Sequence, residues 1–301
     1  MVIPESQLEI WAKPQQTQSA INTHQSIRSA LNSSSSQLKL QGFSENNQFE
    51  IYLQGSYRNR TNIRADSDVD VVVQLNKSFL IDRSNLSLED LRRFSEVYDS
   101  PQYAWDDFYE DIFKTLRDYY FASSVTSGNK SIKLSKGSNR LAADIIPCIQ
   151  YRYYEKFKSI DENYICGICF YTKDSRKMII NYPKLHYQNG KMKNHETEQS
   201  YKPTVRFFKN ARNSIINKYN SRLNAPSYFV ECLLYNVPNL YYYGKYQEIY
   251  ANVVKWLYRN ISNSFLCQNE MLDLFGNKSE QWNLEDAQDF LEGLVELWDN
   301  W

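Results

Sequence analysis

Two aspartates separated by a single valine are the residues of this chain whose types and spacing best suit a chemical reaction. Asp68 and Asp70 flank Val69 and are followed by Val71–Val73. Carboxylates alternating with valines are typical of a strand, so the pattern predicts both carboxylates on one face and valines in a core. Two adjacent anions repel unless a cation lies between them, and Mg²⁺ prefers carboxylate oxygens together with substrate phosphates. The dyad therefore predicts a two-metal site for phosphoryl or nucleotidyl transfer.

A glycine–serine pair upstream supplies the second half of such a site. Residues 48–54 alternate as a strand, and Gln54, Gly55 and Ser56 follow where a turn or helix begins. Glycine lets the backbone approach a phosphate closely, and the serine adds a hydroxyl group. Either motif alone is common in ordinary turns and strand ends. Their order along the chain favours phosphate binding beside metal-binding carboxylates.

A third acid lies in the apolar run 141–147. Asp144 is the only charged residue of that run, and an unpaired carboxylate inside a strand is costly unless it faces a cation. We therefore predict that Asp144 is the third metal ligand. The alternatives are a strand-end acid or a partner for Arg140 or Lys133.

These motifs resemble the signature of polymerase-β-like nucleotidyltransferases, whose third carboxylate comes from a later strand. Three further stretches, 181–186, 201–213 and 226–231, resemble bacterial CD-NTases, the cyclic-oligonucleotide synthases of anti-phage (CBASS) signalling. CD-NTases are related to animal cyclic GMP–AMP synthase and to oligoadenylate synthetase. The resemblance covers about residues 45–235, and its lysine helix followed by Ser-Tyr is more specific than its first motif.

The resemblance implies roles for several residues. Two Mg²⁺ ions, with Mn²⁺ as the alternative ion, would be held by Asp68, Asp70 and Asp144. The donor nucleotide would be bound by the residues Gln54, Gly55, Ser56, Lys209, Ser227 and Tyr228. In this set Lys209 and Ser227 bind the triphosphate, and Tyr228 stacks on a base. A core position is the alternative for Tyr228.

The helix expected from Pro203 onwards carries the predicted lysine. Its apolar stripe is formed by Val205, Phe208, Ile215, Ile216 and Tyr219. The other face carries Lys202, Arg206, Lys209 and Asn213 at helical spacing. That basic face suits a triphosphate, although an ordinary solvated helix face has the same pattern.

The remaining pattern predicts an α+β fold. We expect helices at 6–13, 23–31, 104–121, 246–259 and 284–298, a capping box at Ser87–Asp90, and strands at 48–54, 67–75, 129–135 and around Asp144. The predicted architecture is a polymerase-β-like sheet covered by helices, with a C-terminal helical subdomain and substrate in the cleft between them. The expected domains are a catalytic core at 1–200, which includes the N-terminal helices, and a helical subdomain at 201–301.

Composition bounds the class of protein. The 301 residues include 42% hydrophobic residues, enough for a sizeable core. Lys plus Arg equals Asp plus Glu at 35 each, which argues against long nucleic acid as a partner. The five cysteines indicate free thiols, and Cys166 and Cys169 are expected in a buried strand rather than a zinc site. Without a signal peptide or an apolar span, we expect a cytoplasmic protein that binds no membrane.

The predicted function is Mg²⁺-dependent joining of nucleoside triphosphates into a cyclic oligonucleotide, most simply a cyclic dinucleotide, with release of pyrophosphate. Its expected partners are the nucleoside triphosphates and a downstream effector that responds to the product without a stable complex. One alternative is a template-independent nucleotidyltransferase that acts on RNA, protein or a small molecule. The other is a non-catalytic nucleotide sensor, which retention of three clustered acids disfavours. The sequence does not select the bases, the linkage or the ring size.

Overall fold

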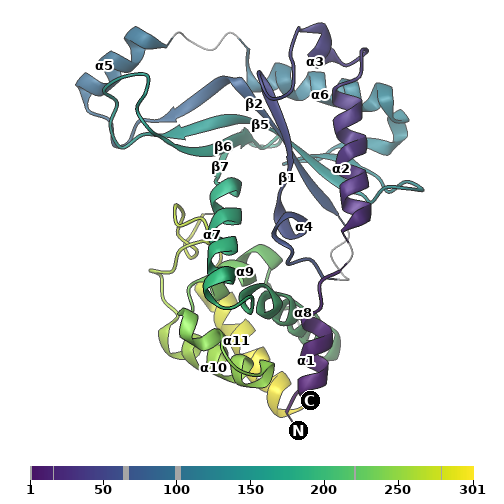
Figure 1. Cartoon of the computed structure of the whole chain (residues 1–301), viewed down its shortest axis with the longest axis vertical. Helices are drawn as coiled ribbons and strands as arrows, with labels where there is room; N and C mark the ends of the chain where they lie inside the picture. Colours follow the sequence, from purple (N-terminus) through teal and green to yellow (C-terminus); the bar gives the residue numbers. More distant parts are fainter. Residues whose placement is uncertain (1, 16, 64–67, 99–102, 220–221, 279) are drawn as a thin grey trace. The chain divides into compact units, whose positions relative to one another are not determined.

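The computed structural model describes residues 2–15, 17–63, 68–98, 103–219, 222–278 and 280–301 (Figure 1). The chain forms two compact units. The sheet unit comprises Thr17–Tyr57 and Ser67–Lys184, and the helical unit comprises Met1–Gln16, Arg58–Asp66 and Leu185–Trp301.

Seven strands formed by the described residues make one sheet in the sheet unit. They are β1 (Phe49–Leu53), β2 (Val69–Asp82), β3 (Val125–Ser127), β4 (Ile132–Leu134), β5 (Ala143–Tyr153), β6 (Ile165–Tyr171) and β7 (Met178–Asn181). The order is β1-β2-β5-β4-β3, while β6 pairs with the later part of β5 and β7 pairs with β6. β2 and β5 are parallel, and the other pairs are antiparallel. The strand predicted at 129–135 is therefore a β3–β4 hairpin in which only β4 falls within that range.

The β2–β5 pair forms the centre of the sheet because both strands are largely apolar. Their register runs from Val69 opposite Ala143 to Leu75 opposite Ile149, and then shifts so that Phe79 lies opposite Gln150. β2 thus carries a bulge between Leu75 and Phe79.

The helices of the sheet unit are α2 (Gln18–Leu31), α3 (Gln37–Leu40), α4 (Gly55–Asn59), α5 (Leu88–Val97) and α6 (Trp105–Tyr119), with a 3₁₀ turn at Ala122–Ser124. α2, α3 and α6 gather at one end of the sheet and α5 lies at the other (Figure 1). The amphipathic helix predicted over 104–121 is confirmed, since Phe108, Ile112 and Leu116 are fully buried. The predicted capping box is also confirmed, because Ser87 accepts a hydrogen bond from the Asp90 backbone N–H at 3.1 Å.

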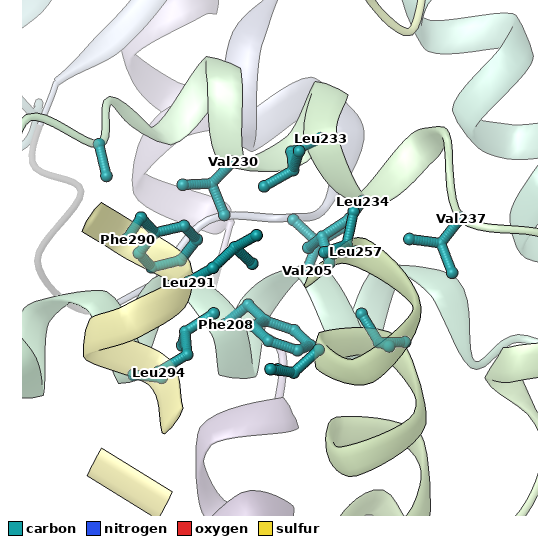
Figure 2. Close-up of a cluster of buried hydrophobic side chains, with 14 of the residues drawn as sticks. Val205, Phe208, Val230, Leu233, Leu234, Val237, Leu257, Phe290, Leu291 and Leu294 are labelled. Carbon is teal, nitrogen blue, oxygen red and sulfur yellow. The ribbon is translucent and has the colours of Figure 1, made fainter. Parts of the chain in front are cut away.

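The helical unit contains α1 (Glu5–Ala12), most of α7 (Pro183–Glu196), α8 (Tyr201–Tyr219), α9 (Ser227–Tyr235), α10 (Tyr246–Asn260), α11 (Leu284–Asp299) and a 3₁₀ turn at Asn239–Tyr242. Figure 2 shows its core, to which α8, α9, α10 and α11 contribute Val205, Phe208, Val230, Leu233, Leu234, Leu257, Phe290, Leu291 and Leu294. The helices predicted at 246–259 and 284–298 are confirmed. None of the described helices combines the length and the apolar character that a membrane span needs.

The first helix packs within the helical unit. Ile3 and Leu8 are fully buried in its core. The Glu5 carboxylate accepts hydrogen bonds from the backbone N–H groups of Tyr246 and Gln247, both at 2.8 Å, and so caps α10. We predicted a division at residue 200, whereas in the structure residues 1–16 and 185–200 lie in the helical unit.

Candidate active site

The central strand pair brings two of the predicted acids together. Asp70 on β2 is the register partner of Asp144 on β5. Side chains of register partners leave the same face of a sheet, so the two carboxylates lie on one face of neighbouring strands. The valines on either side of Asp70 are fully buried, as the alternating pattern predicted.

Gly55 lies directly against Asp70. Its backbone has φ +65°, and a β-carbon there would lie 2.2 Å from the Asp70 Oδ2 atom. The Gln54 backbone N–H also donates to the Asp70 carbonyl at 3.0 Å. Only glycine fits this position, because any side chain would both strain the backbone and displace the carboxylate. The two motifs that the sequence places in order along the chain are thus in contact.

Gln54 and Ser56 occupy the turn that carries Gly55. Ser56 is the second residue of α4 and is partly exposed. The Gln54 Oε1 atom is buried and has no hydrogen-bond partner. A buried acceptor without a donor is unfavourable, so a ligand that donates a hydrogen bond would stabilise this position.

Asp68 lies one residue before β2 and is exposed. The predicted strand 67–75 therefore begins later than expected, and residue 67 lies outside the described ranges. Residues 64–67, which precede Asp68 in the sequence, all lie outside the described ranges.

Asp144 lies near Lys133, one of the two basic residues that we considered as alternative partners for its carboxylate. Lys133 is its cross-strand partner on β4, with Nζ 4.0 Å from the Asp144 Oδ1 atom. The Ser131 hydroxyl donates to the same oxygen at 3.0 Å. Because the Lys133 side chain is 60% exposed, this long ion pair contributes little to stability. The pair with Lys133 therefore does not argue against the predicted role of Asp144.

The three aspartates fit Mg²⁺ in their donor chemistry, because all their ligand atoms are carboxylate oxygens. The register of Asp70 with Asp144 puts two of them on one face. Across the part of the chain that the structure describes, no three His, Cys, Asp or Glu side chains form a ready-made metal cage. Their role as metal ligands stays a prediction.

Lys209 lies within the helical unit in a buried polar network centred on Glu231. The Lys209 Nζ atom is 3.3 Å from Glu231 Oε2 and 3.2 Å from the Thr61 carbonyl oxygen. Glu231 also accepts hydrogen bonds from Asn59 at 3.0 Å and from the Thr61 hydroxyl at 2.8 Å. His186 Nε2 lies 3.2 Å from its other oxygen. We call these five residues the Glu231 network.

The network keeps Glu231 ionised. Burial would raise the pKa of its carboxyl group, but Lys209, His186 and Thr61 outweigh burial and hold that pKa well below its ordinary value. Our sequence analysis missed Glu231. The signal was present, because Glu231 is the only acid within the apolar run Phe229–Leu234, as Asp144 is within its own run.

The alternative that we considered for the basic face of α8, an ordinary solvated helix face, does not hold at two positions. Arg206 and Lys209 are only 5% and 1% exposed. The Arg206 guanidinium donates to the carbonyl oxygens of Ala12 and Arg60, each at 2.6 Å, and burial lowers its pKa to about 10. Helical spacing indicated which residues share a face, but the buried oxygen acceptors around that face come from segments distant in sequence.

Ser227 and Tyr228 lie at the start of α9. The Ser227 hydroxyl accepts a hydrogen bond from Arg212 at 2.9 Å, which puts a guanidinium beside the predicted phosphate ligand. The Tyr228 ring stacks on His186 with 5.3 Å between ring centroids and contacts the helical core. Tyr228 thus has the core contacts of its alternative role, and base stacking stays a prediction.

Comparison with known proteins identifies the protein family to which this chain is similar. Residues 188–299 match the family model of the cGAS/DncV-like nucleotidyltransferase C-terminal helical domain. The chain is 46% identical to a cyclic UMP-AMP synthase of Rhodothermus marinus, over 100% of this chain and 99% of that protein. It is 40% identical to the cyclic nucleotide synthase CdnE01 of Staphylococcus haemolyticus, over the full length of both.

A solved structure agrees in fold. The Rhodothermus marinus CdnE c-UMP-AMP synthase, determined with Apcpp and Upnpp, superimposes with a TM-score of 0.89 at 45% identity and covers 99% of this chain and 97% of that one. The mixed α+β sheet, the contact of Gly55 with Asp70 and the full-length similarity lead to one assignment. The chain belongs to the CD-NTases, the cGAS/DncV-like family of nucleotidyltransferases, which includes cyclic nucleotide synthases.

Proposed function

We propose that this chain joins two nucleoside triphosphates into a cyclic dinucleotide and releases two pyrophosphates. The observation that carries the proposal is the register of Asp70 with Asp144 beside Gly55, in a chain similar over its whole length to cyclic nucleotide synthases. The proposed biological role is anti-phage signalling, in which an effector reads the product without forming a stable complex with the enzyme.

Each round of the proposed reaction is a nucleotidyl transfer. A ribose hydroxyl attacks the α-phosphorus of the donor, a new P–O bond forms, and the bond to the β-phosphate breaks. Asp144 accepts or orients the hydroxyl proton, while Asp68 and Asp70 complete the anionic set. Bound Mg²⁺ would supply the charge that lowers the pKa of the attacking hydroxyl and neutralises the departing pyrophosphate.

A small set of residues is assigned to the donor phosphates. Gly55 allows close approach of the backbone, and Ser56 offers its hydroxyl. Ser227 would stabilise the charge that builds on the leaving group. Lys209, which we expected to share this role, is buried and paired with Glu231, so the proposal gives it a supporting role within the Glu231 network. Arg212 supports the role of Ser227, because its guanidinium already lies 2.9 Å from that hydroxyl. Tyr228 is assigned to the base.

Product analysis tests the proposal. The purified protein is incubated with all four nucleoside triphosphates and Mg²⁺, treated with phosphatase and analysed by mass spectrometry. The wild type should give a phosphatase-resistant ring, and Asp68→Asn with Asp70→Asn should give none. A product found only after RNA, protein or a small-molecule acceptor is added would instead favour the template-independent transferase.

A further inference from the structure

Two neighbouring helices of the helical unit expose charges of opposite sign. α10 and α11 pack against each other within this unit (Figure 1). Each helix exposes a charged residue, an apolar residue three positions later and a second charged residue one position after that. These residues are Lys255, Tyr258 and Arg259 on α10, and Glu292, Val295 and Glu296 on α11. At this spacing the three side chains of each helix lie on one face. We call the six residues the α10–α11 surface.

An apolar groove lies between the two helices at this surface. It has a volume of about 420 Å³, and its lining includes Tyr250, Val254 and Trp298. The rings of Tyr250 and Trp298 stack with 4.8 Å between their centroids, so the fold itself shapes the groove. Tyr258 and Val295 also line it, although they are 57% and 39% exposed. Apolar side chains that remain exposed around a groove indicate a surface that binds another molecule.

The charges beside the groove lack counter-ions within the chain. Among the ion pairs of the described residues, none involves Lys255, Arg259, Glu292 or Glu296. The acidic character extends along the whole of α11, which contains six acidic residues and no basic one. Another molecule that covers the groove must therefore meet a basic row on one side and an acidic row on the other.

A second copy of this chain meets both requirements. In a two-fold dimer a surface meets an identical surface, so a contact between two different residues occurs twice. When the two-fold axis runs along the groove, α10 of one copy faces α11 of the other. The basic row then lies opposite the acidic row, and Tyr258 lies opposite Val295. A partner with charge of only one sign would match one helix and be repelled by the other.

From this self-complementary pattern we infer that the α10–α11 surface binds a second copy of this chain in a two-fold symmetric dimer. The apolar centre supplies the contact area, and the charged rows set the orientation. No residue of this surface is assigned to the proposed reaction, so the inference stands apart from the proposed function.

Sedimentation equilibrium of the full chain, over a wide range of protein concentration, tests the inference. The wild type should form a dimer reversibly, and high salt should weaken it. Lys255→Glu with Arg259→Glu makes both helices acidic, whereas Glu292→Lys with Glu296→Lys makes both basic. Each double variant alone should have a dimer dissociation constant about ten-fold higher than that of the wild type.

Mixing the two double variants is the sharper measurement. In the mixture the acidic helices of one variant meet the basic helices of the other, so a heterodimer should form about as tightly as the wild-type dimer. A single chain that carries all four substitutions should also dimerise, because its two rows have exchanged signs. Recovered association would show at the same time that the substituted chains are folded.

The matched control is Lys156→Glu with Lys158→Glu, which changes the net charge equally at exposed positions of the sheet unit. It should dimerise as the wild type does. An equal loss of association in this control would overturn the inference, and so would a mixture of the two double variants that stays monomeric. A wild type that is monomeric at every concentration would also overturn it and leave the groove to a partner of a different kind.

Discussion

At the residue scale, the absence of a side chain at Gly55 determines where the Asp70 carboxylate can lie. Gly55 is the residue against which the Asp70 carboxylate packs, and its positive φ excludes most side chains on backbone grounds as well. These two constraints can be separated, because Gly42 has a similar φ of +74° but no atom near the position of a β-carbon.

Gly55→Ala should therefore lower kcat by about 100-fold, since displacement of a catalytic group by an ångström costs on that order. Gly42→Ala is the control: it carries the same backbone strain, about 1–2 kcal/mol, without touching an acid. Steady-state kinetics of both variants, with thermal unfolding to match their stabilities, gives the comparison. Equal activities would show that Asp70 does not need its observed position.

At the element scale, Glu231 joins four segments of the helical unit. It lies on α9 and bonds to α7 through His186, to α8 through Lys209, and to the end of α4 and the following loop through Asn59 and Thr61. A buried ion pair adds little when complete, but the loss of one partner leaves the other as an uncompensated buried charge.

Glu231→Gln should destabilise the protein by about 3–5 kcal/mol, because Lys209 keeps a buried charge without a counter-ion. The exposed Glu292→Gln on α11 should change stability by less than about 0.5 kcal/mol. Adding Lys209→Met to Glu231→Gln should recover part of the loss. Urea unfolding measures all three, and a Glu231→Gln protein as stable as the Glu292→Gln control would contradict the network.

The Glu231 carboxyl group also makes the stability of the folded protein depend on pH. Its folded pKa lies below its ordinary value of 4.5, so the unfolded chain binds more protons in acid. The stability that Glu231 contributes is present above pH 4.5 and is lost as pH falls below it towards the folded pKa. The wild type should therefore lose stability more steeply than Glu231→Gln between about pH 5 and pH 3.

The sequence predicted the helices and strands better than it predicted which of their polar side chains are buried. The strand positions of Asp70 and Asp144 and the capping box at Ser87 each follow from local alternation or spacing, which a single segment contains. The burial of Lys209 and Arg206 depends on acceptors from Glu231, Ala12 and Arg60, which are distant in sequence. A local sequence pattern does not predict contacts between residues that are so far apart in the sequence.

At the scale of the whole molecule, the helical unit is assembled from three separate stretches of chain. A division into consecutive domains could not describe it, because no linker composition marks where the chain passes from one unit to the other. The first helix shows the consequence most clearly, since it lies at the opposite end of the sequence from α10 and yet caps it through Glu5.

Leu8→Ala tests this assignment of α1. Leu8 is fully buried, and its truncation should cost about 2–5 kcal/mol. Ile10→Ala on the same helix removes a side chain that is 57% exposed and should cost little. By hydrogen exchange, Leu8→Ala should lower protection in α8 and α10 before β2 and β5. Loss of protection that begins in the sheet would contradict the membership of α1 in the helical unit.

The bulge in β2 makes one strand pair serve two purposes. Between Leu75 and Phe79 the partner on β5 advances by a single residue, from Ile149 to Gln150. This phase change sets Phe79 on the same face as Asp144, where the Arg152 guanidinium covers its ring at 3.6 Å. Lengthening or shortening the bulge by one residue would turn Phe79 over and uncover Arg152, while Asp70 and Asp144 kept their register. The bulge therefore lets the far half of the strand pair take its own facing without a change in the register of the acids.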